Sequence, residues 1–520
     1  MSSKIVKFDH DVRESIRLGI ETLSKAVKTT MGPKGKTVLI ERQGMHPIVT
    51  KDGVTVAKSI NLSDPFQNIG LQVVKEAASR SAEEAGDGTT TATVLTQAIY
   101  EAGLRYISAG IDSVILRNGI EASINDLLDE LSKLARKIES DDELLNIALV
   151  SCNNERETAE LIVNAIKKVG SEGSIIVEEA KGYKSDLKIV EGFQVDRGYM
   201  SPYFVTDEDK NQAILEKCHI LILNKKIENM KEVVKPLEIS LESGRPILVI
   251  ANEIDNEALQ GLVVNKIKGN LKVCAIKSPG FGDARHDLLG DIATITGANV
   301  IDHSHDMEDF EDVWLGECKK VIVDRSGSLF IADDKDIKEK VDSRITTVKS
   351  MLDDPSLEPK QRDYLNYRLQ RLNGGVAILR IGAATEAEMI ERRDRVDDAL
   401  HATRAALEEG IVPGGGVALI IAAEKIKNSD SPGCAIIKNA CLAPLKQIVK
   451  NTGKSSELVI EKIKERADTN FGYDAREAKY GDMYELGVID PHKVVRCAIQ
   501  NACSAASLLL TSDCAIVDEK

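Results

Sequence analysis

The chain has 520 residues, 42% of them hydrophobic and 29% charged, a balance typical of soluble globular proteins. Its formal net charge of −15 argues against nonspecific nucleic-acid binding, and no uninterrupted apolar run has the length of a membrane span. At about 150 residues per domain, the length favours roughly three domains.

Nine cysteines are scattered along the chain and none forms a C-x-x-C pair, which indicates reduced thiols in a cytosol-like compartment. The first residues, Met1–Lys4, lead directly into the strand-like Ile5–Phe8. We therefore expect no signal peptide and a cytoplasmic location.

The N-terminal region predicts one long helix followed by short strands. Apolar residues recur at helical spacing over Val12–Val27, and the pattern closes at Thr30–Pro33. Strands are expected at Lys36–Glu41 and Pro47–Thr50. After a glycine-bearing turn we expect another short strand at Val54–Ala57.

The stretch Ala85–Thr93 reads Ala-Gly-Asp-Gly-Thr-Thr-Thr-Ala-Thr and predicts a tight turn between two helices, the first beginning at Asp64-Pro65. Free N–H groups at a helix start favour an anion, and glycines let a phosphate approach the backbone. A capped corner is the alternative, but three consecutive threonines favour a phosphate site, with Asp87 suited to a bridging magnesium ion. The chain has no G-x-x-x-x-G-K-[ST] loop, so a nucleotide here needs a different architecture.

The middle of the chain changes character near Gly173. Helical patterns dominate from residue 89 to about 168, and strand-like segments then alternate with helices, which predicts a separate α/β domain. A long charged helical stretch is expected across Asp342–Leu372, and a further helical segment over Glu386–Gly410. The layout therefore looks nested, with both chain ends forming one helical domain around the inserted α/β region.

Further candidate site residues lie in the last quarter of the chain. Asp397 and Asp398 lie on the helix that ends at Gly410, and either could face a cleft or simply be solvated. The triple glycine of Pro413–Gly416 opens an apolar helix, which suits a close ligand or a tight turn. Asp490 could accept hydrogen bonds from a ribose diol.

Several motifs together resemble the GroEL-type (group I) chaperonins, and they run in order over essentially the whole chain. The quoted stretches are Gly32–Gly35, Thr50–Val54, Gly86–Thr91, Asp196–Tyr199, Ser201–Phe204, Pro279–Asp283, Asp398–Ala406 and Gly414–Gly416. The resemblance implies a multidomain α/β fold. A mainly helical equatorial domain (1–134 and 410–520) binds ATP, a small α/β intermediate domain (135–191 and 375–409) acts as a hinge, and an inserted α/β apical domain (192–374) binds polypeptide and a lid.

The resemblance also implies the site residues for ATP and Mg²⁺. Asp52 and Asp398 would be catalytic, and Asp87 would coordinate the metal. The family's ATP-binding positions correspond to Thr30, Met31, Gly32, Pro33, Lys51, Asp87, Gly88, Thr89, Thr90, Thr91, Gly415, Asp474, Ala475, Arg476 and Asp490. At the nucleoside end, Gly415 would approach the nucleoside and Asp490 would take the ribose; Asp474 stands near the base, where the family usually has Asn.

The resemblance implies an ATP-dependent chaperone that captures non-native polypeptides and folds them in the cavity of a homo-oligomeric ring. The ring would have seven subunits and would work with a GroES-type cochaperonin. Apolar polypeptide-binding positions correspond to Tyr199, Tyr203, Phe204, Val234, Leu237, Leu259, Val263 and Val264, although periodicity alone favours a helix core for them. The alternatives are a holding protein with little ATP turnover and a small-molecule kinase. No nucleic-acid or membrane partner is expected.

Overall fold

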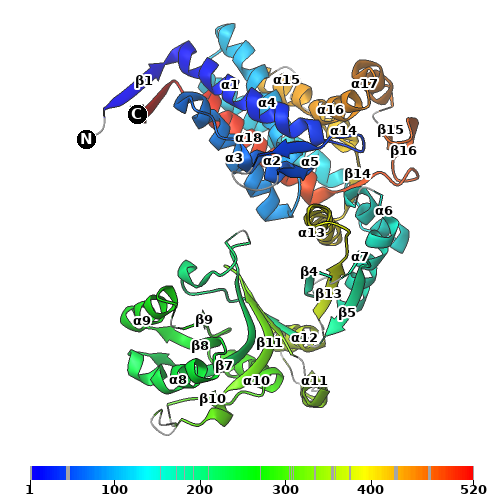
Figure 1. Cartoon of the computed structure of the whole chain (residues 1–520). Helices are drawn as coiled ribbons and strands as arrows, with labels where there is room; N and C mark the ends of the chain where they lie inside the picture. The colour runs from blue at the N-terminus through cyan, green and yellow to red at the C-terminus, as the bar shows by residue number, and fades with distance from the viewer. Residues whose placement is uncertain are drawn as a thin grey trace. The chain divides into compact units, whose positions relative to one another are not determined.

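The computed structural model describes residues 3–41, 47–152, 154–170, 173–180, 182–190, 192–208, 210–269, 271–303, 305, 307, 310–332, 335–352, 357, 359–373, 376–426, 431–466 and 470–518. The fold is a mixed α/β fold, as predicted (Figure 1). It divides into two compact units, and each is described by itself. The first contains Met1–Asn164, Val177–Asp186 and Ile381–Lys520, and the second contains Ala165–Ile176 and Leu187–Arg380.

The expected apical segment 192–374 falls within the second unit. The predicted intermediate domain (135–191 and 375–409) is divided between the two units, and its separation from the equatorial domain stays a prediction. Its expected boundary at Gly374 and Gly375 lies outside the described residues.

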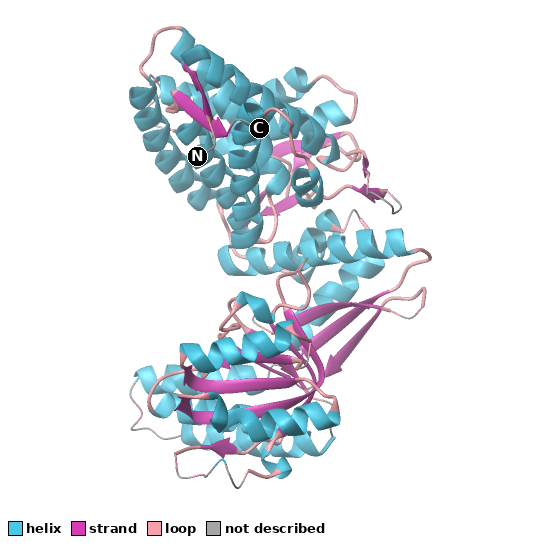
Figure 2. Ribbon diagram, turned by 60° about the vertical axis from the view of Figure 1, so that its left-hand side comes forward, coloured by secondary structure: helices cyan, strands magenta, loops and turns pink. Residues whose placement is uncertain are grey.

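Long helices form the core of the first unit (Figure 2). The Asp64 carboxylate caps the third helix by accepting from the N–H groups of Phe66 and Gln67, and Gly86 ends this helix at φ 74°. The longest helices pack their apolar faces together and bury Ile16, Leu95 and Ile499 almost completely. The helices are α1 (Asp9–Val27), α2 (Gly53–Ser59), α3 (Pro65–Ala85), α4 (Thr89–Ser108), α5 (Ser113–Leu134), α6 (Asp141–Ser151), α13 (Glu386–Glu409), α14 (Val417–Glu424), α15 (Pro432–Ala440), α16 (Ala443–Asn451), α17 (Ser456–Lys464), α18 (His492–Leu510) and the 3-10 turn Lys28–Thr30.

Short two-stranded sheets connect these helices. They are β1 (Lys4–Phe8) with β18 (Cys514–Asp518), β2 (Val38–Ile40) with β3 (Ile48–Thr50), β14 (Ile411–Pro413) with β17 (Ile489–Pro491), and β15 (Phe471–Asp474) with β16 (Lys479–Asp482). Strands β1 and β18, at the two ends of the chain, pair with each other within one chain, from Lys4 opposite Asp518 to Phe8 opposite Cys514.

The strand predicted at Val54–Ala57 is wrong, because these residues belong to helix α2. Val54, Thr55 and Val56 have β-branched side chains that favour strands. The Asp52 carboxylate nevertheless caps a helix here, accepting from the N–H groups of Val54 at 2.8 Å and Thr55 at 2.7 Å. A good cap and a buried position for Val56 outweigh a weak strand propensity.

The second unit is built on a seven-stranded sheet in the order β6-β12-β11-β7-β8-β9, with β10 paired to β7. The parallel strands β7, β8 and β9 are connected through helices α8 and α9, and their apolar residues form one buried core. The strands are β6 (Gly192–Val195), β7 (Ala213–Ile227), β8 (Ile247–Ile254), β9 (Val273–Lys277), β10 (Val300–Ile301), β11 (Gly316–Val323) and β12 (Ser328–Ile331). The helices are α8 (Val234–Ser243), α9 (Asn256–Ile267), α10 (Asp283–Thr296), α11 (Lys335–Leu352) and α12 (Pro359–Asn373), with 3-10 turns at Pro202–Phe204, Met230–Val233 and Asp312–Trp314.

The helical stretch expected across Asp342–Leu372 forms the packed pair of helices α11 and α12. A proline cannot continue a helix, and Pro359 begins the second one. A buried ion-pair cluster holds the pair to α10, because Asp291 accepts from both Arg344 and Arg368 at 2.8 Å.

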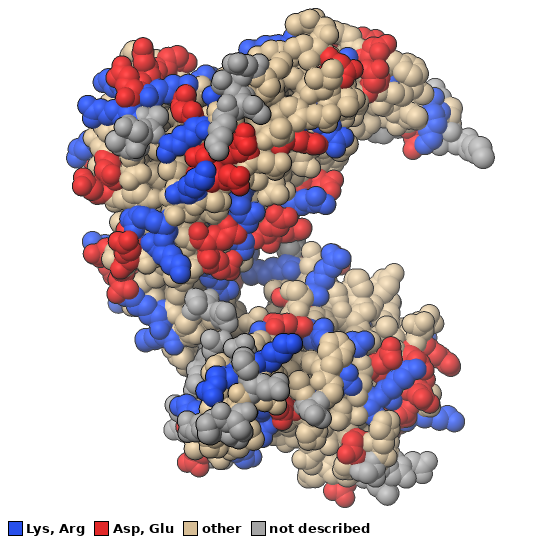
Figure 3. All heavy atoms as spheres, turned by 180° about the vertical axis from the view of Figure 1, so that it is seen from behind, with Lys and Arg blue, Asp and Glu red and all other residues tan. Residues whose placement is uncertain are grey.

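The remaining elements, α7 (Arg156–Val169), β4 (Ile175–Glu179), β5 (Asp186–Val190) and β13 (Val376–Ile381), are divided between the two units, and the strands form a sheet in the order β4-β13-β5. Among the described residues no helix is long and apolar enough to cross a membrane. On the face drawn in Figure 3, acidic and basic side chains of the described residues are interspersed.

Candidate functional site

A cavity of about 570 Å³ lies within the first unit, in the size range of small-molecule sites. Every residue that the sequence named as catalytic, ATP-binding or metal-binding lines this cavity. These residues come from the ends of α1, β3 and α3, from the start of α4, and from α13, β14, β15 and β17. Segments separated by hundreds of residues therefore converge on one site.

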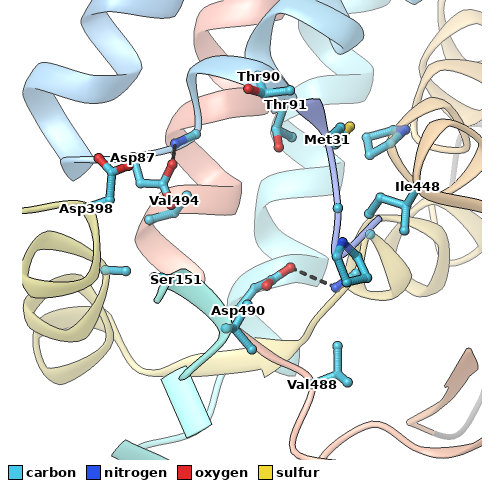
Figure 4. A pocket seen from close by; sticks show the side chains of 18 of the residues that line it. Met31, Asp87, Thr90, Thr91, Ser151, Asp398, Ile448, Val488, Asp490 and Val494 are labelled. Carbon is cyan, nitrogen blue, oxygen red and sulfur yellow. Dashed lines mark hydrogen bonds between the residues drawn. The ribbon is translucent and has the colours of Figure 1, made fainter. Parts of the chain in front are cut away.

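The turn between α3 and α4 forms one wall of the cavity. Gly86 and Gly88 adopt left-handed conformations, at φ 74° and 94°, and α4 begins at Thr89 without a side-chain cap. The first N–H groups of a helix have no partner inside it, so this end of α4 offers donors and a positive dipole end to an anion. Thr90 and Thr91 lie at this wall (Figure 4).

Asp52 lies on the neighbouring wall, at the start of α2. Its carboxylate is held in place by the cap bonds to α2, and its own N–H donates to the Thr50 hydroxyl at 2.9 Å. A methyl group on Gly53 would come within 2.2 Å of the Thr90 Oγ1. The absence of a side chain at this glycine therefore lets α2 approach the start of α4 closely.

Asp87 and Asp398 point toward one another across the cavity (Figure 4). Asp87 follows α3 and accepts from the Gly88 N–H at 2.5 Å, whereas Asp398 lies on α13. Burial raises the pKa of Asp398 well above its usual value, and the negative charges of Asp87 and Asp52 raise it further. Burial also raises the pKa of Asp87, opposed by the Gly88 N–H. Such a group of carboxylates is stabilised when a cation lies between them.

The opposite end of the cavity is formed by β14, β17 and the triple glycine. Asp490 lies on β17, opposite Val412 in the register, and its Oδ2 accepts from the Gly415 N–H at 3.0 Å. Burial raises the pKa of Asp490 to about 6. Gly415 and Gly416 have positive φ angles of 65° and 82°, which favour glycine and leave the backbone open to a ligand.

Asp474, Ala475 and Arg476 line a third part of the cavity, at the β15–β16 turn. The Asp474 Oδ1 accepts from the N–H groups of Arg476 at 2.7 Å and Glu477 at 3.2 Å. The Asp474 carboxylate, at the position where the family usually has Asn, therefore stabilises the turn itself.

Sequence reasoning missed the residues that α6, the turn after it and the first half of α13 contribute to the cavity. They are Asn146, Ile147, Leu149, Val150, Ser151, Asn154, Glu391, Asp394 and Arg395. Most of these residues have no sequence feature that would mark them as part of a site, because their helices follow ordinary amphipathic patterns. Asn154 is the exception, since it adopts φ 70°, and asparagine tolerates this conformation better than most residues.

The expected polypeptide-binding residues lie in the second unit and divide into two groups. Tyr203 is 65% exposed, and Val234 and Val264 are also exposed, whereas Tyr199, Leu259 and Val263 are partly buried against the core. Phe204 and Leu237 are buried, so the expectation of an exposed surface is wrong for these two residues. Their helical spacing does not distinguish the face that packs on the sheet from the face that solvent reaches.

The exposed apolar residues belong to neighbouring segments. Lys266 on α9 donates to the carbonyl oxygens of Tyr203 at 2.6 Å and Val205 at 2.7 Å, which fixes the Pro202–Phe204 turn beside α9. Val264 and Ile267 on the same helix are exposed, as is Leu241 on α8.

The fold is that of a chaperonin. Over 99% of its length the chain superposes on the chaperonin gp146 of the bacteriophage EL 2 (Pseudomonas aeruginosa), solved in the presence of ATP-BeFx, covering 100% of that protein with a TM-score of 0.70 and 24% sequence identity. A second crystal form of the same phage protein gives a TM-score of 0.65 and 22% identity, with 99% of each chain covered.

The chain belongs to the TCP-1/cpn60 chaperonin family, whose family model matches residues 23–520. This confirms the chaperonin resemblance of the motifs. As a member of this family, the protein is a molecular chaperone.

Proposed function

We propose that the protein is a ring-forming chaperonin that hydrolyses ATP with Mg²⁺ in the cavity of the first unit. The observation that carries this proposal is the convergence of Asp52, Asp87 and Asp398 beside the uncapped start of α4. The ATP-BeFx in the phage protein's crystals supports a nucleotide as the ligand.

The residues around the phosphate turn have separate roles in this proposal. The N–H groups at the start of α4 and the hydroxyls of Thr90 and Thr91 bind the triphosphate. Asp87 would hold the magnesium ion, which neutralises phosphate charge, and the mutual repulsion of the buried carboxylates fits a cation there. Asp398, with Asp52, orients and activates the attacking water. Asp490 accepts from the ribose, and the Asp474 turn flanks the base.

The chemistry is linked to folding through a movement of the intermediate segment that carries α13. Because Asp398 belongs to that segment, hydrolysis would depend on its position, as in other enzymes gated by closure. ATP binding would then bias the apical segment between capturing unfolded chains and binding a GroES-type lid, by its differential affinity for the two states. The ring would have seven subunits and act in the cytoplasm.

A steady-state ATPase assay, with and without a denatured protein, tests this function. We expect Mg²⁺-dependent ATP hydrolysis together with suppression of client aggregation. Aggregation suppression without hydrolysis would favour the alternative of a holding chaperonin with little turnover. Phosphate transfer to a small-molecule acceptor would favour a kinase.

The client surface is tested by the double substitution Tyr203→Glu and Val264→Glu. A charge in an apolar contact carries a desolvation cost that a client cannot offset, so we expect aggregation suppression to be lost while ATPase activity remains. Leu458→Glu, at an exposed apolar position on α17, is the matched control and should leave capture unchanged. Normal capture by the double variant would contradict the assignment of this surface.

A further inference from the structure

The C-terminal end of α13 is joined to the N-terminal part of α18 by a charged cluster. Glu409 is the last residue of α13, and its two carboxylate oxygens accept from Arg496 at 2.6 Å and 3.0 Å. The same carboxylate contacts the Nδ1 of His492, the first residue of α18, at 3.0 Å. Beside this cluster, Lys493 donates to Glu408 at 2.6 Å.

His492 is fixed in this position by its backbone and by burial. Its N–H donates to the Gly410 carbonyl at 3.0 Å, and only 5% of the residue is exposed. Its Nε2 is buried and has no hydrogen-bond partner among the described residues. Since a carboxylate can only accept, the neutral imidazole must carry its hydrogen on Nδ1, which leaves Nε2 as an unpaired acceptor.

Protonation would place an additional N–H group in this buried position without an acceptor. The charged groups that face the imidazole are Glu409 from α13 and Arg496 from α18. On the adjoining strand, Asp490 turns instead to Gly415. Burial lowers the pKa of His492, Glu409 opposes this shift, and Arg496 adds to it. A proton is therefore bound more readily when the cluster is open, so acid favours opening.

The cluster fixes one end of the helix that carries Asp398. Asp398 lies eleven residues before Glu409, about 16 Å along α13. On the other side of the cluster, α18 supplies Val494 and Val495 to the cavity wall. Opening the cluster would therefore release α13 from the wall that it faces.

We propose that His492 is a positioning residue that locks α13 to α18 in its neutral form and releases it as the pH falls through the range in which histidine titrates. The lock consists of the contacts that Glu409 makes with His492 and Arg496. Its effect on ATP turnover, through Asp398, rests on the proposed function.

Hydrogen–deuterium exchange of the backbone amides in segment 403–411 tests the lock directly. We compare the full-length protein with His492→Asn, whose amide can still donate to Glu409 but does not titrate, and with His492→Leu, which cannot donate. Between about pH 8 and about pH 6, we expect the wild type to lose up to about fourfold more protection than His492→Asn, after correction for intrinsic rates. His492→Leu should be less protected at both pH values.

The control is His219→Asn in the second unit, where a similarly buried histidine contacts Ser243. It should leave the exchange of segment 403–411 as in the wild type. Equal pH dependence in the wild type and His492→Asn would overturn the proposal, as would wild-type protection in His492→Leu.

Single-turnover ATP hydrolysis over the same pH range gives a second readout. The wild-type rate should fall more steeply toward acid than the rate of His492→Asn, and parallel profiles would remove the link to turnover. If the wild type did not hydrolyse ATP at all, the proposed function would fail, whereas the exchange experiment would still decide whether His492 locks α13.

Discussion

At the scale of single residues, Asp87 and Asp398 should have separable roles. A carboxylate beside a triphosphate is tolerated when a cation lies between them, so Asp87→Ala should weaken Mg²⁺–nucleotide binding and hydrolysis together. Asp398→Ala should bind ATP almost normally and hydrolyse it about 10²–10⁴ times more slowly, the usual loss for a group that positions or deprotonates water. Titration calorimetry and single-turnover hydrolysis measure the two effects.

The matched control for Asp398 is its neighbour Asp397, which lies on the same helix but does not line the cavity. Asp397→Ala should retain both affinity and rate. Equal losses of affinity in the Asp87 and Asp398 variants would show that the two roles are not distinct.

Asp490 predicts a pH-dependent stability of the nucleotide-free protein. Its pKa is raised from 3.8 to about 6, so the folded state binds this proton more readily than the unfolded state. The stabilising contribution of the Asp490 proton is therefore fully present below about pH 4 and is lost as the pH rises from there to about 6, at a cost of at most about 3 kcal/mol. Asp490→Asn keeps an acceptor for the Gly415 N–H and should raise the thermal unfolding midpoint by more at about pH 8 than at about pH 5, where only about half of the contribution has been lost.

Asp112→Asn is the control for Asp490, because Asp112 is an exposed helix cap that asparagine can replace. Its unfolding midpoint should follow the wild type at both pH values. A stabilisation of Asp490→Asn that was the same in acid and in base would refute the assigned shift.

At the scale of elements, the α3–α4 turn depends on a glycine that lets α13 approach. A methyl group on Gly86 would come within 2.1 Å of the His401 Cβ, and the residue also adopts φ 74°. An alanine in a left-handed conformation costs about 1–2 kcal/mol of backbone strain, and the clash with His401 adds to this cost. Gly86→Ala should therefore lower the free energy of unfolding by more than the strain alone, and it should also weaken nucleotide binding. Thermal unfolding and calorimetry with ATP measure both losses.

Gly110 provides the comparison for Gly86, since it adopts φ 91° with no atom near the position of an added methyl group. Gly110→Ala should show the strain alone and bind nucleotide normally. If both variants lost the same stability and affinity, the contact between Gly86 and α13 would have no role.

At the scale of the whole molecule, the free edges of the β1–β18 and β2–β3 sheets predict self-association. Ile516 on β18 and Leu39 on β2 are exposed apolar residues on strands of two-stranded sheets, whose free edges can pair with another chain. We expect a ring of about seven chains per layer at micromolar concentration, with closed symmetry. The pair Leu39→Asp and Ile516→Asp should shift the mass measured by mass photometry toward the monomer.

Leu458→Asp, which places the same charge at an exposed apolar position of α17, should leave the assembly intact. A wild-type protein that remained monomeric with and without ATP would rule out the ring.

Most elements were predictable because local signals are strong where periodic apolar residues meet a cap. α3 shows this, since Asp64, Pro65 and Gly86 mark both of its ends. The same reasoning failed at Val54–Ala57, where the cap from Asp52 outweighed three β-branched residues. It found the helical stretch of α11 and α12 but did not divide it into two helices, because a helical pattern continues in sequence across a break in the helix.

The sequence by itself determined the chaperonin family and the kinds of groups in the site, because glycine turns, threonine-rich helix starts and carboxylates are local features. Only the tertiary structure decided that Asp52, Asp87, Asp398 and Asp490 share one cavity, and that α6 supplies another wall. It also decided that Tyr203 and Val264 are exposed while Phe204 and Leu237 are buried. The physical reason is that burial and proximity depend on which elements pack together, and periodicity along one chain segment does not specify its partner.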